Sequence, residues 1–150
     1  MITRINVIDE VFYGVSREGD PNDTWDRDST YEDHNVTGIR VVEGYSDLEV
    51  GFTPEPNKDY WLLYGIYSTG DSFGTDDGRI SYVDLYEDRG VAEENAKRLR
   101  KHNEGDEDCY SCKLIHESGK EYQFHVPWKG YFERLSYLEV KAVRIGGSRF

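Results

Sequence analysis

The pattern of apolar and polar positions predicts a chain built mainly of β-strands. Residues 60–68 give the clearest signal, because apolar and aromatic side chains occupy both parities of the stretch YWLLYGIYS. A strand that is apolar on both faces is typical of the centre of a sheet that is covered on both sides. A returning strand is predicted from four apolar positions, Ile80, Tyr82, Val83 and Leu85. The two segments predict a hairpin at the middle of a sheet.

Residues 69–78, which join these two strands, contain three glycines and three aspartates. Both residue types favour turns, glycine because it tolerates positive φ and aspartate because its side chain bonds nearby backbone amides. The segment therefore predicts a long, ordered and acidic loop at the tip of the hairpin.

The first 52 residues predict further strands with a second acidic segment between them. Residues 2–16 alternate as a strand does, and Asp9 interrupts one apolar set, which indicates an edge strand or a strand with one wet side. Residues 17–35 carry seven carboxylates and two arginines, with no helical or strand period, and predict a long acidic loop. Two short strands are predicted at 36–43 and 48–52.

One helix is predicted, over residues 89–103. Asp88 precedes it as the N-cap, because a carboxylate at that position accepts hydrogen bonds from the first free backbone amides. Ala92, Ala96 and Leu99 form a narrow apolar stripe at helical spacing, which suits close packing on a sheet. Gly105 ends the helix.

The remaining chain predicts a hairpin at 110–126, which turns at Ser118-Gly119, and a last strand at about 134–145. The expected fold is therefore α+β: a single domain over 1–150, mostly antiparallel sheet of about seven or eight strands, with one main helix.

The net charge of −12 on 150 residues limits the classes of partner. Phosphates and anionic lipids repel such a chain, so direct binding to nucleic acid or to a membrane is disfavoured, whereas a basic protein surface attracts it. The plainer alternative is that the acidity only maintains solubility. The absence of an apolar run of about 20 residues and of a signal-peptide layout predicts a cytoplasmic protein. Two cysteines exclude a disulfide framework.

The triplet Gly70-Asp71-Ser72 follows the central strand and has the residue types of the GDSL esterases. In that family the serine heads a helix and a later Asp-x-x-His supplies the base. Here a strand follows, and that partner motif is missing, so the serine has no positioned base. The triplet predicts a turn in which Asp71 caps backbone amides, and no catalytic residue is assigned.

Four residues have the chemistry of a zinc site, namely His102, Cys109, Cys112 and His116. In a strand, however, positions 109 and 112 face opposite sides. Clustered carboxylates at 26–28 and 71–77 have the chemistry of a Ca²⁺ or Mg²⁺ site, without the glycine and terminal glutamate of an EF-hand. We expect a core Cys112 beside a surface Cys109, solvated acidic loops, and no cofactor.

Two stretches, WLLYGIYSTGDSFG and PWKGYFERLSYLEVKAV, resemble a group of small uncharacterised accessory proteins of tailed bacteriophages. The resemblance covers about half of the chain, 60–100 and 127–143. It implies an accessory protein that acts on a host component, in the host cell cytoplasm. No catalytic residues are known for the group, so none are carried over.

These observations favour a non-enzymatic protein that binds, and inhibits, a host protein with a basic surface. The residues expected to contact that partner lie in the two acidic loops: Asp20, Asp23, Trp25, Asp26 and Asp28, and Asp71, Asp76 and Asp77. Trp25 is included because an aromatic side chain amid carboxylates suits an interface anchor. The alternatives are a small-molecule or nucleotide-binding protein, which would use Gly70, Ser72, Gly74 and Arg79 to hold an anion, and a metal-dependent enzyme. The oligomeric state is left open.

Overall fold

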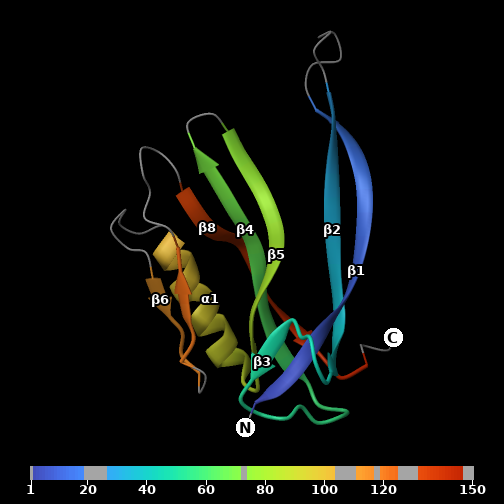
Figure 1. Cartoon of the computed structure of the whole chain (residues 1–150), viewed down its shortest axis with the longest axis vertical. Helices are drawn as coiled ribbons and strands as arrows, with labels where there is room; N and C mark the ends of the chain where they lie inside the picture. Colours follow the sequence, from blue (N-terminus) through green and yellow to red (C-terminus); the bar gives the residue numbers. More distant parts are fainter. Residues whose placement is uncertain are drawn as a thin grey trace.

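The computed structural model describes residues 2–18, 27–71, 74–103, 111–116, 119–124 and 132–146. Within them the chain forms eight strands and one helix, which Figure 1 shows in chain order: β1 (Thr3–Glu18), β2 (Arg27–Val41), β3 (Leu48–Val50), β4 (Tyr60–Asp71), β5 (Gly74–Tyr86), α1 (Arg89–Asn103), β6 (Ser111–Lys113), β7 (Glu121–Gln123) and β8 (Phe132–Val143). The predicted α+β class with mostly antiparallel sheet is confirmed. The single helix of the described residues is too short and too polar to cross a membrane.

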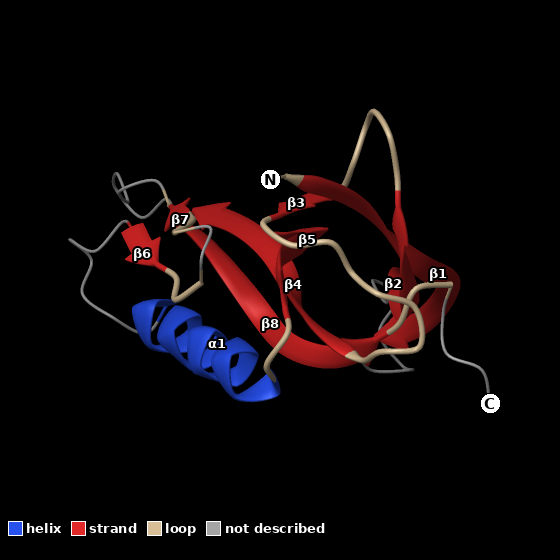
Figure 2. Ribbon diagram, turned by 90° about the horizontal axis from the view of Figure 1, so that it is seen from below, coloured by secondary structure: helices blue, strands red, loops and turns tan. Residues whose placement is uncertain are grey.

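The strands form three antiparallel sheets. The central sheet has the order β5-β4-β8, so the predicted central strand is confirmed as its middle strand. A second sheet, of order β2-β1-β3, lies over one face of it, and α1 and the β6-β7 pair lie over the other. Figure 2 shows these layers from below, with α1 on the outside of β8.

One part of the core lies between the two three-stranded sheets. Its buried members come from the six strands of these sheets: Ile5, Val36, Ile39, Leu48, Val50, Tyr60, Leu62, Tyr64, Leu85 and Val143. Along one edge the sheets are joined by backbone hydrogen bonds, because the Ile39 amide donates to the Arg144 carbonyl at 3.0 Å and the Gly146 amide donates to the Ile39 carbonyl at 3.0 Å. Burial of both faces of β4 explains its continuous apolar sequence.

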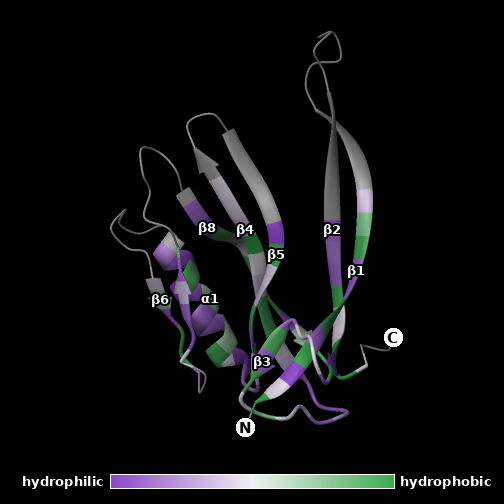
Figure 3. Cartoon of the chain, viewed as in Figure 1, coloured by the Kyte–Doolittle hydropathy of each residue, from purple (hydrophilic) through white to green (hydrophobic). Residues whose placement is uncertain are grey.

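A second core lies under α1. Leu63 and Val83 of the central sheet meet Ala92, Ala96 and Leu99, which are the predicted apolar stripe of the helix. Figure 3 shows hydrophilic residues over most of α1, as expected for a helix that buries only one narrow face. The helix begins where predicted, because the Gly90 amide donates to the Asp88 carboxylate at 2.8 Å.

Two predicted loops are wrong in the described residues. β1 continues to Glu18 and β2 begins at Arg27, so residues 27–35 are strand and not loop. β4 continues to Asp71 and β5 begins at Gly74, so the long loop at 69–78 is also strand on both sides. Both segments pair with a neighbouring strand even though their sequences lack the apolar alternation that marks a buried face.

Candidate functional site

The distal half of the β1-β2 hairpin leaves the body of the protein. We call residues 10–18 of β1 and 27–35 of β2 the arm. On the face of β1 that looks toward the central sheet, Ile5 is fully buried, whereas Tyr13 is 76% exposed. On the opposite face Phe12 is 56% exposed. Figure 1 shows the same trend, since β1 and β2 diverge from β4 and β5 with distance from the base.

The arm is held together by its own pairing. Its strands pair from Glu10↔Asn35 to Glu18↔Arg27, whereas β3 pairs with β1 only at Thr3–Ile5. A two-stranded hairpin without a covering layer is marginally stable in water. The arm therefore depends on how it is fixed at its base.

A β-bulge sets the direction of the arm at this base. The register shifts between Ile8 and Asp9, so that Thr37 is an extra residue of β2, and its hydroxyl donates to the Ile8 carbonyl at 3.3 Å. Without the extra residue Ile39 and Val36 would face opposite sides of the sheet, because side chains alternate along a strand. With it both are fully buried.

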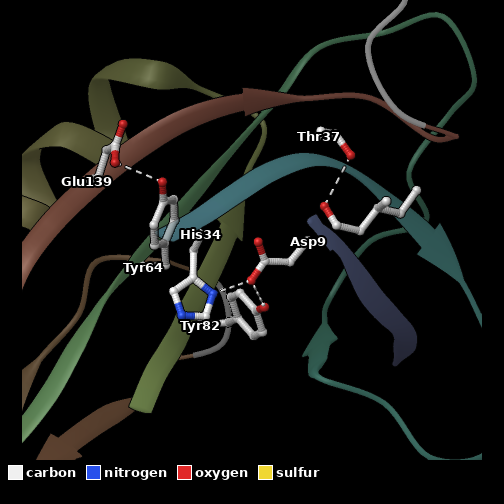
Figure 4. A network of polar contacts seen from close by, with 7 residues as sticks. Asp9, His34, Thr37, Tyr64, Tyr82 and Glu139 are labelled. Carbon is white, nitrogen blue, oxygen red and sulfur yellow. Dashed lines mark hydrogen bonds and ion pairs between the residues drawn. The ribbon is translucent and has the colours of Figure 1, made fainter. Parts of the chain in front are cut away.

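A polar cluster lies directly above these two residues, between the two sheets. The Asp9 carboxylate of β1 lies 2.7 Å from the His34 Nδ1 of β2, and the Tyr82 hydroxyl of β5 donates to the same carboxylate oxygen at 3.3 Å. Figure 4 shows the three side chains converging from separate strands. The side chains of Asp9 and His34 are only 9% and 15% exposed. The cluster thus fastens the base of the arm to the central sheet.

The row of polar groups continues across the central sheet. Tyr64 of β4 is the cross-strand neighbour of Tyr82, and its hydroxyl donates to the Glu139 carboxylate of β8 at 2.8 Å. Burial raises the pKa of Tyr64, and the adjacent Glu139 carboxylate raises it further. Burial likewise raises the pKa of Tyr82, with the negative charge of Asp9 as the next cause. Both phenols therefore stay protonated at neutral pH and act as hydrogen-bond donors.

The hydrogen bonds of this cluster are suited to holding the base of the arm in place. The second oxygen of the carboxylate, Asp9 Oδ1, is buried and accepts no hydrogen bond from any described residue. A largely buried carboxylate is costly unless its partners are kept, so removal of either donor is expected to loosen the base of the arm. Hydroxyls with raised pKa are poor nucleophiles and bases at neutral pH, so neither Tyr64 nor Tyr82 is assigned a role in covalent catalysis.

Charge concentrates on the arm and on the segment that connects its strands. Residues 9–35 carry nine carboxylates and two arginines, a net charge of −7 out of −12 for the whole chain. Glu10 and Asp33 are diagonal neighbours across the two strands, and a basic partner relieves the repulsion between them. Residues 9–35 are therefore a strongly acidic stretch of the sequence.

The predicted contact residues divide between described and undescribed parts of the chain. Asp28 lies in β2 opposite Arg17 of β1, which corrects its predicted place in a loop. Four others, Asp20, Asp23, Trp25 and Asp26, belong to the connecting segment 19–26, which lies outside the described residues. The second predicted patch is strand: Asp71 ends β4, and Asp76 and Asp77 lie in β5 opposite Thr69 and Ser68.

The anion-binding alternative required a loop at residues 70–79, and the described residues of this segment are strand. Gly70 and Gly74 are both strand residues, paired with Thr75 and Asp71 respectively, and Arg79 is an exposed residue of β5. Ser72 lies outside the described residues. Backbone amides that are engaged in a ladder are not available to cradle a phosphate.

The proposed zinc ligands are only partly described. Cys112 is buried in the core under α1, as predicted, and Cys109 lies outside the described residues. His102 stacks on Phe124, and His116 lies beside Asp84, at 3.8 Å between Nδ1 and Oδ2. Across the described part of the chain, no three His, Cys, Asp or Glu side chains gather as a metal site does.

Comparison with known proteins adds no relative. No family model matches the chain, and neither the curated proteins nor the solved structures contain a match.

Sequence reasoning missed the polar cluster at the base of the arm. Its one signal was Asp9, a carboxylate at an inward position of an otherwise apolar strand. His34 gave no signal, because the bulge at Thr37 reverses the parity of β2 and nothing in the sequence marks a bulge there. Tyr64 and Tyr82 occupy apolar positions of the strand pattern. The partners of their hydroxyls, Glu139 and Asp9, follow only from the way in which the strands and sheets pack.

Proposed function

We propose that this chain is a non-enzymatic binding protein that engages a basic surface of another protein through its acidic arm. The observation that carries the proposal is a paired, projecting hairpin that exposes the aromatic side chains of Phe12 and Tyr13 within residues 9–35, a stretch of net charge −7. Exposed large apolar side chains on a projecting element are typical of interaction sites.

The two features have separate roles in binding. The charge of residues 9–35 steers a basic partner and accelerates association, an effect that falls as salt is added. Aromatic side chains supply the apolar contact area that dominates the free energy at the centre of an interface. Phe12 and Tyr13 lie on opposite faces of β1, so a partner that wraps the arm contacts both.

The wider context in this proposal is that of a phage accessory protein. The resemblance of residues 60–100 and 127–143 to such proteins supports a partner in the bacterial host, and occupation of that partner's basic surface would inhibit it. A basic surface that normally holds DNA is the kind of target that an acidic arm is suited to block.

The test compares three forms of the full chain, immobilised and exposed to bacterial lysate, followed by titration of the purified partner. The arm variant is Asp26→Lys/Asp28→Lys, which changes one residue of the connecting segment and one residue of β2. The matched control is Glu93→Lys/Glu94→Lys, which changes the net charge equally on α1, where both side chains are more than half exposed.

We expect the wild type and the helix control to retain one salt-sensitive partner, and the arm variant to bind it at least about tenfold more weakly, because two attractive charges become repulsive. Equal binding by all three forms would remove the arm from the interface. Equal loss in both variants would indicate an effect of net charge alone.

A further inference from the structure

We infer that the partner binds as an added β-strand along the outer edge of β1 from Asp9 to Tyr13, and that the added segment is extended and basic. This inference rests on the proposed function and states how the arm is engaged. It concerns the backbone of the arm, whereas the proposed function concerns its charge.

The register of the hairpin determines which backbone groups point outward. In an antiparallel pair, alternate residues direct both N–H and C=O away from the partner strand. Odd-numbered residues of β1 do so, because the Val7 amide and the Ile5 carbonyl form bonds on the side away from β2. The bulge lies in β2 and leaves this parity unchanged. Asp9, Val11 and Tyr13 therefore present their backbone groups at the outer edge.

The outward backbone groups of this edge have partners up to Val7 and none among the described residues beyond it. β3 pairs with β1 at Thr3–Ile5, and beyond it the Asp47 carboxylate accepts the Val7 amide at 2.7 Å, as a third strand would. For Asp9, Val11 and Tyr13 no described residue supplies such a partner to the outward backbone groups. An uncovered edge of three outward positions is a template for an added strand.

Side chains cover several carbonyls on the edge strands of the central sheet, in contrast. On β5 the Val83 carbonyl accepts the Lys120 ammonium at 3.2 Å and the Tyr82 carbonyl accepts the Tyr122 hydroxyl at 3.2 Å. On β8 the Leu138 carbonyl accepts the Arg100 guanidinium at 2.8 Å. Side chains thus cover these three carbonyls of the central sheet, whereas no described residue covers the edge of β1 from Asp9 to Tyr13.

The side chains beside the open edge define the chemistry of the added strand. On the outer face of the hairpin Phe12 has Glu10 on its own strand and Asp33 opposite. A segment that alternates lysine or arginine with apolar residues directs all its charges to one face of the sheet and its apolar residues to the other. Its charges then lie beside Glu10 on the outer face, and its apolar residues lie beside Val11 and Tyr13 on the face that looks toward the central sheet. A second copy of this chain is a poor occupant, because it would bring together two copies of residues 9–35, each of net charge −7.

Val11 offers a matched pair of variants. Val11→Pro removes the outward N–H and leaves the β1-β2 ladder intact, since proline is tolerated where the missing N–H faces solvent. Val11→Ala shortens the same side chain and keeps the N–H. Urea unfolding of both variants establishes that each is folded; if Val11→Pro is not, Tyr13→Pro against Tyr13→Ala repeats the comparison one step farther from the core.

The probe is a nine-residue peptide that alternates lysine and valine, beside the same peptide with alternate amides N-methylated. Both carry the same charge, and only the first can extend a sheet. We expect the unmodified peptide to bind Val11→Ala about as it binds the wild type, and to bind Val11→Pro at least about tenfold more weakly, because an edge hydrogen bond is lost and a carbonyl of the peptide is left unpaired. Amide hydrogen exchange of Val11 and Tyr13 is expected to slow on binding.

Three results would overturn the inference while the proposed function stands. They are equal binding by Val11→Pro and Val11→Ala, equal binding of the N-methylated peptide, and capture of the same partner from lysate by the wild type and by Val11→Pro. A dimer in sedimentation that Val11→Pro abolishes would assign the edge to a second copy instead. Failure of the wild type to bind any partner or peptide would overturn both proposals.

Discussion

Replacement of Tyr82 by phenylalanine provides a stability test of the polar cluster that depends on pH in a defined way. The substitution keeps the ring between the two sheets and removes only the hydroxyl that donates to Asp9 at 3.3 Å. Hydrogen bonds to charged groups contribute about 1.5–3 kcal/mol, and the length of this one indicates the lower end. At pH 7 we therefore expect Tyr82→Phe to lower the free energy of unfolding by about 1.5 kcal/mol.

At alkaline pH the deficit is expected to disappear. Burial and the charge of Asp9 raise the pKa of Tyr82 in the folded protein, so the folded protein retains this proton above pH 10 while the unfolded chain loses it. The wild type consequently loses stability as pH rises through about 10. At pH 11 an unfolded phenol with a pKa of about 10 is stabilised by roughly 1.4 kcal/mol through ionisation. The phenylalanine variant does not undergo this loss.

The assay is urea unfolding followed by tryptophan fluorescence at pH 7 and pH 11 for the wild type and Tyr82→Phe. Other groups titrate over this range, but they are common to both proteins and cancel in the difference. Since Tyr82 keeps some contact with water, the value of about 1.4 kcal/mol is an upper bound. An equal deficit at both pH values would refute the reasoning. Tyr13→Phe, on a ring that is 76% exposed, is the control at pH 7 and is expected to change the free energy of unfolding by less than about 0.5 kcal/mol.

Two further predictions concern the helix that covers the other face of the central sheet. Asp88→Ala removes the acceptor of the Gly90 amide and is expected to cost about 1 kcal/mol in urea unfolding, whereas Asp88→Asn retains most of the stability; equal losses would contradict the capping role. Leu99→Ala empties a fully buried position in the core under α1 and is expected to cost about 3 kcal/mol. Val41→Ala, at a position 47% exposed, is its control, and a similar cost for both would show that burial does not set the penalty.

The helix and the central strand could be predicted because burial imposes a period on their sequences. The helix occupies residues 89–103 as predicted, since a capping carboxylate and a stripe of small apolar residues fix both its start and its buried face. β4 was predicted because both of its faces are covered, which requires an unbroken apolar run. In each case tertiary packing and the local pattern require the same residues.

The arm could not be predicted for the converse reason. Phe12 and Tyr13, on opposite faces of β1, are both exposed. A hairpin without a buried side shows no alternation in its sequence, and clustered carboxylates then suggest a loop. Residues 27–35 are nevertheless strand, because pairing with β1 satisfies their backbone groups. Residues 69–71 of β4 and 74–78 of β5 are strand for the same reason, because they pair with each other.

The sequence predicted that the candidate site is acidic, but it did not predict how the side chains at its base are arranged. The sequence indicated that residues 17–35 were the acidic contact region, and that remains a prediction for the segment that the structure does not describe. The convergence of Asp9, His34 and Tyr82 depends on a bulge and on the packing of one sheet on another. Neither produces a periodic pattern in the sequence. Long-range pairing of this kind is set by the whole fold.

The self-contained pairing of the arm has a consequence for how its reach can evolve. Because, among the described residues, its strands pair only with each other beyond Asp9, one residue inserted into each strand extends the hairpin by about 3.4 Å without moving a core side chain. Because side chains alternate along a strand, the same carboxylates stay on one face only when two residues, or another even number, are inserted into each strand. Related chains with arms of different length are therefore expected to differ by even numbers of residues per strand, while the bulge at Thr37 and the cluster below it stay constant.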